Sequence, residues 1–102
     1  MKKVKIKLTY AQFESLLNKI EVATVSNIKS NSPQLRLVVA TLMVLLVKLN
    51  IRFASFRTSY TISFTAPEAM ALLVFHIEYD QEPATNNIVF LETVSIIHKA
   101  YA

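Results

Sequence analysis

The stretch VKIKLTYAQFESLL at residues 4–17 recurs without gaps as YTISFTAPEAMALL at residues 60–73. Four aligned positions are identical: Ile6 and Ile62, Thr9 and Thr65, Leu16 and Leu72, Leu17 and Leu73. Each copy begins with alternating apolar and polar residues and continues into a helical pattern, so the matched positions have matched structural roles. We therefore interpret the two stretches as an internal repeat of a strand followed by a helix.

The alternation assigns the side chains of both predicted strands to two faces. The inward set is apolar and aromatic: Val4, Ile6 and Leu8 in the first strand, and Phe56, Tyr60, Ile62 and Phe64 in the second. The outward set is basic or hydroxylated: Lys3, Lys5, Lys7, Arg57, Thr61 and Ser63. We expect the outward set to be the more exposed one, and a register slip of one residue would exchange the two faces.

A helix start follows each strand. Thr9 with Gln12, and Thr65 with Glu68, have the spacing of a capping box. In this motif the threonine hydroxyl accepts from a backbone N–H of the first turn, and the longer side chain reaches back to the cap. Pro67 falls in the first turn, where its missing N–H costs nothing.

Helical patterns fill the rest of the chain. They predict four helices: from Tyr10 to about Ile28, from Pro33 to about Asn50, from Ala66 to about Tyr79, and from about Thr85 to Ala100. Because two helices return the chain between the strands, this order favours antiparallel pairing. We predict an α+β fold with an internally duplicated β-α-α-β-α-α order, in which four helices pack on one face of a two-stranded antiparallel sheet. Residues 1–102 form one domain, with pseudo-repeats at about 3–52 and 56–102.

The chain has 102 residues, of which 53% are hydrophobic and 18% are charged. This composition is typical of one globular domain and argues against disorder. The sequence contains neither cysteine nor glycine. The missing cysteines exclude disulfides, zinc–thiolate sites and thiol nucleophiles. The missing glycines exclude the P-loop, the dinucleotide-binding fingerprint, the EF-hand loop and the nucleophile elbow.

The most apolar run covers residues 37–47, between Arg36 and Lys48. As a helix it spans ~17 Å, which is too short for a bilayer core of about 30 Å. We therefore expect no membrane span and a cytoplasmic protein. A helix that is apolar on every side needs other protein surface against every side. It is therefore either the central helix of a monomeric core, or part of it faces a second subunit. We expect a two-fold homodimer that uses the free strand edge or the exposed part of this helix.

The net charge of +4 is unevenly distributed. Residues 1–57 hold ten basic and two acidic residues, whereas residues 58–102 hold one basic and five acidic ones. Basic side chains on the outward sheet face can neutralise phosphates and form a candidate nucleic-acid site: Lys3, Lys5, Lys7 and Arg57. The strand aromatics are predicted to point inward, however, where they cannot stack on bases. The simpler explanation of the asymmetry, which we favour, is that two oppositely charged halves pack against each other within a monomer or between subunits.

Two further sets of residues are candidates for chemistry. Glu78, Asp80 and Glu82 alternate as ligands of a hard cation would, but they lack the glycine of an EF-hand loop, and a solvated linker is the simpler interpretation. His76 and His98 lie on different predicted helices, and no spacing brings them to one metal. We predict no metal, no cofactor and no catalytic residue, because no motif aims a hydroxyl at a base.

These features favour a non-enzymatic interaction module that acts as a homo-oligomer or in a larger assembly with a protein partner. The alternative is a nucleic-acid-binding accessory protein that uses the basic sheet face. The two differ in one property, because a nucleic-acid-binding protein is retained on DNA or RNA in a salt-dependent way.

Overall fold

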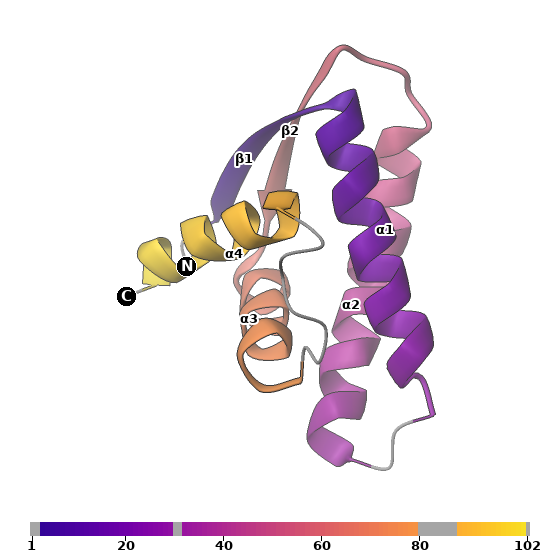
Figure 1. Cartoon of the computed structure of the whole chain (residues 1–102), viewed down its shortest axis with the longest axis vertical. Helices are drawn as coiled ribbons and strands as arrows, with labels where there is room; N and C mark the ends of the chain where they lie inside the picture. The colour runs from indigo at the N-terminus through magenta and orange to yellow at the C-terminus, as the bar shows by residue number, and fades with distance from the viewer. Residues whose placement is uncertain (1–2, 30–31, 80–87, 102) are drawn as a thin grey trace.

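The computed structural model describes residues 3–29, 32–79 and 88–101, and these form an α+β fold (Figure 1). The elements in chain order are β1 (Val4–Thr9), α1 (Tyr10–Asn27), α2 (Pro33–Phe53), β2 (Ser59–Phe64), α3 (Ala66–Val74), the π-helical turn η1 (Phe75–Tyr79) and α4 (Ile88–Tyr101). The predicted order of strands and helices is confirmed. The internal duplication stays a prediction.

The two strands form an antiparallel sheet in which Ile6 pairs with Ile62. The predicted parity is confirmed for both strands. Every second side chain is buried: Val4, Ile6, Leu8, Tyr60, Ile62 and Phe64. On the other face Lys5, Lys7 and Thr61 are exposed and Ser63 is partly buried. The sheet therefore contributes one apolar face to a core that the helices complete.

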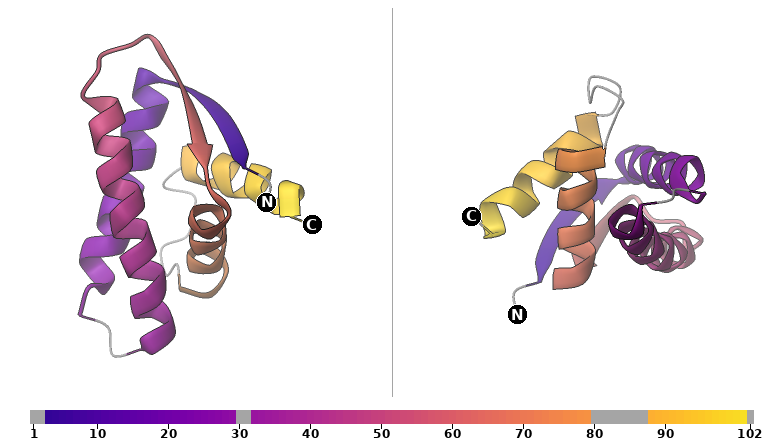
Figure 2. Two further views of the ribbon diagram at one scale, coloured as in Figure 1. Left: turned by 180° about the vertical axis from the view of Figure 1, so that it is seen from behind. Right: turned by 90° about the horizontal axis from the view of Figure 1, so that it is seen from below.

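The helices form two groups on different sides of the molecule. α1 and α2 lie side by side as a long hairpin, whereas α3 and α4 cross each other next to the sheet (Figures 1 and 2). Phe13, Leu16 and Ile20 of α1 and Phe90 and Ile97 of α4 are almost completely buried in the shared core. Seen from behind, α2 faces the viewer with no other element over it (Figure 2, left).

Phe56 and Arg57 lie ahead of β2, which begins only at Ser59. The prediction that Phe56 points inward is wrong, since 77% of this residue is exposed. The reason is the Tyr60 hydroxyl, which donates to the Ser55 carbonyl and accepts from the Arg57 N–H, both at 3.0 Å. These bonds fold the preceding segment back over Tyr60. The centroids of the Phe56 and Tyr10 rings lie 5.3 Å apart.

Two predicted helix ends differ from the structure, and a third lies outside the described residues. α2 continues to Phe53 instead of ending near Asn50, because the Asn50 side chain donates to the Leu46 carbonyl and does not cap the helix. α3 changes to the π-helical turn η1 at Phe75. α4 is described from Ile88, so its predicted start at Thr85 lies outside the described residues.

Both predicted capping boxes are present. The Gln12 N–H donates to the Thr9 hydroxyl at 3.2 Å and the Thr9 N–H to the Gln12 side chain at 2.9 Å. At the start of α3 the Glu68 N–H donates to the Thr65 hydroxyl at 3.5 Å, and the Thr65 N–H donates to the Glu68 carboxylate at 2.8 Å. Each strand therefore passes directly into a capped helix.

Removal of either cap hydroxyl is expected to destabilise the fold. Thr9→Ala and Thr65→Ala should each lower the free energy of unfolding by about 1 kcal/mol, because a backbone N–H loses its acceptor. Urea unfolding measures the difference. Thr58→Ala is the control, since Thr58 is exposed in the segment before β2 and its replacement should change stability by less than about 0.5 kcal/mol. Equal effects at Thr58 and the two caps would contradict the capping role.

Candidate functional site

The outer face of α2 is apolar and exposed. The inner face buries Leu35, Val39, Leu42, Leu45 and Leu49 in the core. Five residues, which we call the outer seam, point the opposite way: Leu37, Ala40, Val44, Val47 and Ile51. All five are exposed, and the four larger ones have exposed fractions of 61–71%. The described residues therefore leave the outer side of this helix exposed, and within this part of the chain α2 is not a fully enclosed hub.

The outer seam continues into a groove on each side. A groove of about 260 Å³ between α1 and α2 is lined by Val25, Ile28, Met43 and Val47, among others. A second groove, of about 200 Å³, lies between α2 and α3 and includes Leu37 and Met70. Isolated exposed apolar residues are ordinary on protein surfaces, but a contiguous patch of this kind is typical of an interaction site.

By length and composition, α2 is apolar enough to cross a membrane. The prediction from the 11-residue run underestimated the helix, which has 21 residues. In this fold, however, five of its side chains contribute to the same core as the sheet and α1. The absence of a membrane span stays a prediction.

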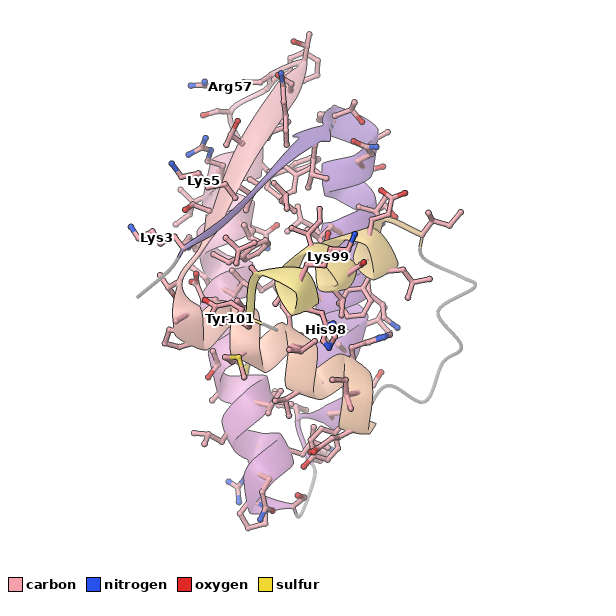
Figure 3. All side chains as sticks on the ribbon, turned by 90° about the vertical axis from the view of Figure 1, so that its left-hand side faces the viewer. Lys3, Lys5, Arg57, His98, Lys99 and Tyr101 are labelled. Atoms are coloured by element: carbon pink, nitrogen blue, oxygen red, sulfur yellow. The ribbon has the colours of Figure 1, made fainter. Side chains whose placement is uncertain are left out.

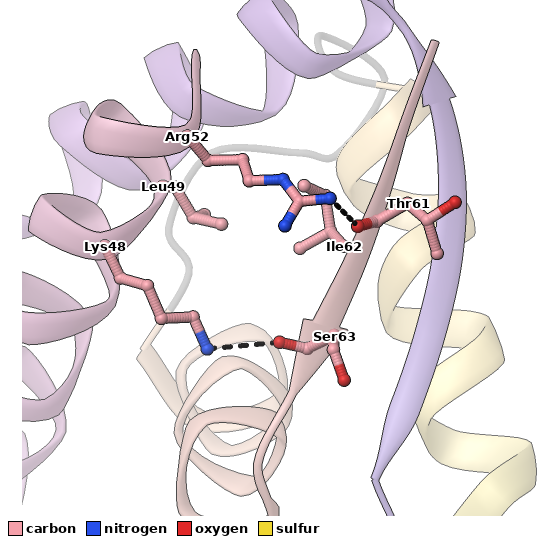
Figure 4. Close-up of a pocket in the computed structure, with 6 residues that line it drawn as sticks. All are labelled: Lys48, Leu49, Arg52, Thr61, Ile62 and Ser63. Atoms are coloured by element: carbon pink, nitrogen blue, oxygen red, sulfur yellow. Dashed lines mark hydrogen bonds between the residues drawn. The ribbon is translucent and has the colours of Figure 1, made fainter. Parts of the chain in front are cut away.

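The side of α2 next to the sheet carries two cations that cover the free edge of β2 (Figure 4). Lys48 Nζ donates to the Ser63 carbonyl at 3.1 Å, and Arg52 Nη2 donates to the Thr61 carbonyl at 3.0 Å. They line a pocket of about 220 Å³. A free strand edge invites pairing with another chain, and these two side chains occupy two outward carbonyls of the β2 edge.

Lys48 also forms an ion pair between the basic part of the chain, residues 1–57, and the acidic part, residues 58–102. Its Nζ lies 2.8 Å from Glu68 Oε1, and this carboxylate is the one that caps α3. Burial acts to raise the pKa of Glu68, but the hydrogen bonds from Lys48 and the Thr65 N–H and the charge of Lys48 outweigh it, so the net pKa is lowered. Glu68 is therefore held in its charged form.

The basic residues predicted to bind nucleic acid lie along one side of the sheet. Figure 3 shows Lys3, Lys5 and Arg57 on the same side, with Arg57 at the far end from Lys3. Lys7 shares the exposed face of β1. Next to Arg57, the exposed Phe56 ring is an aromatic surface that the sequence interpretation had placed in the core.

His76 and His98 line the same pocket, of about 340 Å³, between the end of α3 and α4. The rest of its lining is mainly apolar. The His76 ring meets the Phe90 ring edge-on, with 5.8 Å between the ring centroids. Among the described residues, no group of three or more histidines, aspartates or glutamates could hold a metal ion. Glu78 is exposed in η1, while Asp80 and Glu82 lie outside the described residues. Because the lining of this pocket is mainly apolar, its presence between the two histidines does not indicate a ligand that both would bind.

Comparison with known proteins gives no further guide to function, because no family model, curated protein or solved structure matches the chain.

Proposed function

We propose that this chain is a non-enzymatic interaction module that works as a homo-oligomer or in a larger assembly. The observation that carries the proposal is the uncovered apolar face of α2, which lies directly opposite the residues that this helix buries. Covering such a face with another protein surface removes apolar area from water, and this is the main favourable term in protein association.

Size-exclusion chromatography with light scattering, run over a dilution series, tests this function. We expect a molar mass above 11.5 kDa that falls on dilution. A mass of 11.5 kDa at every concentration, with no change when nucleic acid is added, would contradict homo-oligomerisation.

A second candidate function is nucleic-acid binding by the basic face of the sheet. It is favoured by the exposed lysines Lys5 and Lys7 of β1, by Lys3 just before this strand, and by the exposed Phe56 ring next to Arg57 in the sequence. Lysines on such a face neutralise phosphates, and an exposed ring can stack on a base. The same lysines also protect a strand edge from aggregation, so this candidate ranks second.

The two functions make different predictions for salt dependence. If the sheet binds single-stranded DNA, Lys5→Gln should reduce the slope of log affinity against log salt by about 0.7, the value for one lost phosphate contact. Lys29→Gln, beyond the end of α1, is the control and should leave the slope unchanged. Binding titrations with an oligonucleotide at several salt concentrations measure both. Equal slopes for the unmodified chain and the Lys5 variant would exclude the basic face as the site.

The duplication of a βαα unit is part of the proposal. It is supported by the two capping boxes and by the sheet register, because the equivalent residues Ile6 and Ile62 are direct cross-strand partners. A pseudo-two-fold axis between two units would pass between these residues. The units differ beyond the strands, since α1 has 18 residues and α3 has 9 before η1.

A further inference from the structure

The outer seam has the spacing of a helix-pairing surface. Its members are separated by three, four, three and four residues, which is the heptad repeat of two helices that pack knobs into holes. We propose that a second copy of this chain packs on this seam, with the two α2 helices antiparallel around a two-fold axis. This inference rests on the proposed function and specifies the surface that performs it.

Antiparallel knobs-into-holes packing fixes the partners across the axis. We assign the register in which Val44 packs against the partner's Ala40 and Leu37 packs against the partner's Val47, with the two-fold axis level with residue 42. The small Ala40 side chain leaves room for the larger valine. A two-fold axis repeats both contacts, so one patch is sufficient for both subunits.

The charges beside the seam fit this orientation. Arg36 and Lys48 are the basic residues that flank it, and α2 contains no acidic residue. In the antiparallel register Arg36 lies near the partner's Asn50 and Lys48 near the partner's Gln34, so no like charges face each other. The two helix dipoles also oppose each other, whereas parallel helices would align them unfavourably.

The exposed apolar area reaches the lower limit of what a stable pair buries. Seven large side chains lie on the seam and the adjoining α1–α2 groove, with exposed fractions of 43–71%: Val25, Ile28, Leu37, Met43, Val44, Val47 and Ile51. They hold roughly 400 Å² of apolar surface, taking ~100 Å² for a fully exposed side chain. Because about 65% of a homodimer interface is apolar, this corresponds to roughly 600 Å² per partner, at the lower end of standard interfaces.

The strand edges are poorer candidates for the same second copy. On β2 the outward carbonyls of Thr61 and Ser63 already accept from α2 side chains. On β1, antiparallel pairing with another β1 that kept the apolar face inward would bring lysines of the two copies opposite each other. Like charges directly opposite destabilise a sheet. The outer seam is therefore the surface we assign to the partner.

Disulfide trapping tests the arrangement, since the chain has no cysteine of its own. Leu37→Cys and Val47→Cys chains, mixed and oxidised, should give the mixed disulfide as the main product. Neither variant should cross-link to itself, because its two copies would lie about ten residues apart along the helices, ~15 Å, beyond the reach of a disulfide. Val22→Cys, at an exposed position of α1 that does not line the groove, is the control and should not cross-link.

A charge substitution provides the second measurement. Val44→Glu would place two carboxylates close together in an apolar contact and should weaken dimerisation at least tenfold. Val22→Glu, at a position that is 55% exposed, should leave dimerisation unchanged. Circular dichroism checks that both variants fold.

The outcomes separate this inference from the proposed function. A chain that dimerises without the mixed disulfide, or whose dimer tolerates Val44→Glu, overturns the α2 pairing and leaves the interaction module intact. A chain that never self-associates overturns the pairing and the homo-oligomeric form of the proposed function, and leaves only the role in a larger assembly with a different protein. Binding of the monomer to phosphatidylcholine vesicles, lost in Val44→Glu, would overturn the pairing and assign the seam to a lipid surface.

Discussion

Leu45→Ala is expected to lower the free energy of unfolding by about 2–5 kcal/mol. Leu45 lies in the middle of α2 and is fully buried, in contact with the core that the sheet and the other helices share. Truncation removes its apolar contacts and leaves a cavity that close-packed neighbours cannot fill completely. Urea unfolding of the monomer, with the slope m unchanged, measures the loss.

The neighbouring residue is the matched control. Val44 lies on the outer seam and is 68% exposed, so Val44→Ala should change the stability of the monomer by no more than about 0.5 kcal/mol. The two variants occupy adjacent positions of the same helix and differ in the face they occupy. Comparable losses for both would show that α2 is enclosed on all sides, contrary to the structure.

Glu68→Ala is the second large effect, with an expected loss of about 2–3 kcal/mol at neutral pH. The substitution removes charge-assisted hydrogen bonds from Lys48 and the Thr65 N–H, and such bonds contribute more than neutral ones. Glu68→Gln should cost only about 1 kcal/mol, because glutamine can retain the capping bond, as Gln12 does in α1, and loses only the partly exposed ion pair.

The stability that Glu68 contributes should decrease as the pH falls. Its folded-state pKa lies below the ordinary value of 4.5, so its stabilisation is fully present above that value and is lost as the pH falls through the folded pKa. The stability difference between the unmodified chain and Glu68→Gln should be constant near neutral pH and shrink under acid conditions. Urea unfolding at a series of pH values measures it. A difference that grows on acidification would contradict the lowered pKa.

The sheet and its caps could be predicted from the sequence because both depend on local patterns. Alternation over six residues determines which side chains of β1 and β2 point inward, and a capping box needs only a threonine and the residue three positions later. Lys5 and Ile62 therefore lie on the predicted faces.

Features that depend on individual side-chain contacts, and not on a repeating pattern, could not be predicted. Phe56 continues the alternation of the strand, but the Tyr60 hydroxyl bonds the segment before β2 and leaves the ring in solvent. The pair of Lys48 and Glu68 joins residues twenty positions apart. In α2 apolar residues occur on every side, so periodicity cannot distinguish Leu45 from Val44, and only the packing of the fold identifies the outer seam.

Sedimentation equilibrium of the unmodified chain at low and high salt tests the central claim, that the module self-associates by burying apolar surface. We predict a mass that rises with concentration from 11.5 kDa towards twice that value. The same curve is expected at both salt concentrations, because burial of apolar surface is not screened as surface charge is. A mass of 11.5 kDa throughout, or an association that high salt abolishes, would contradict it.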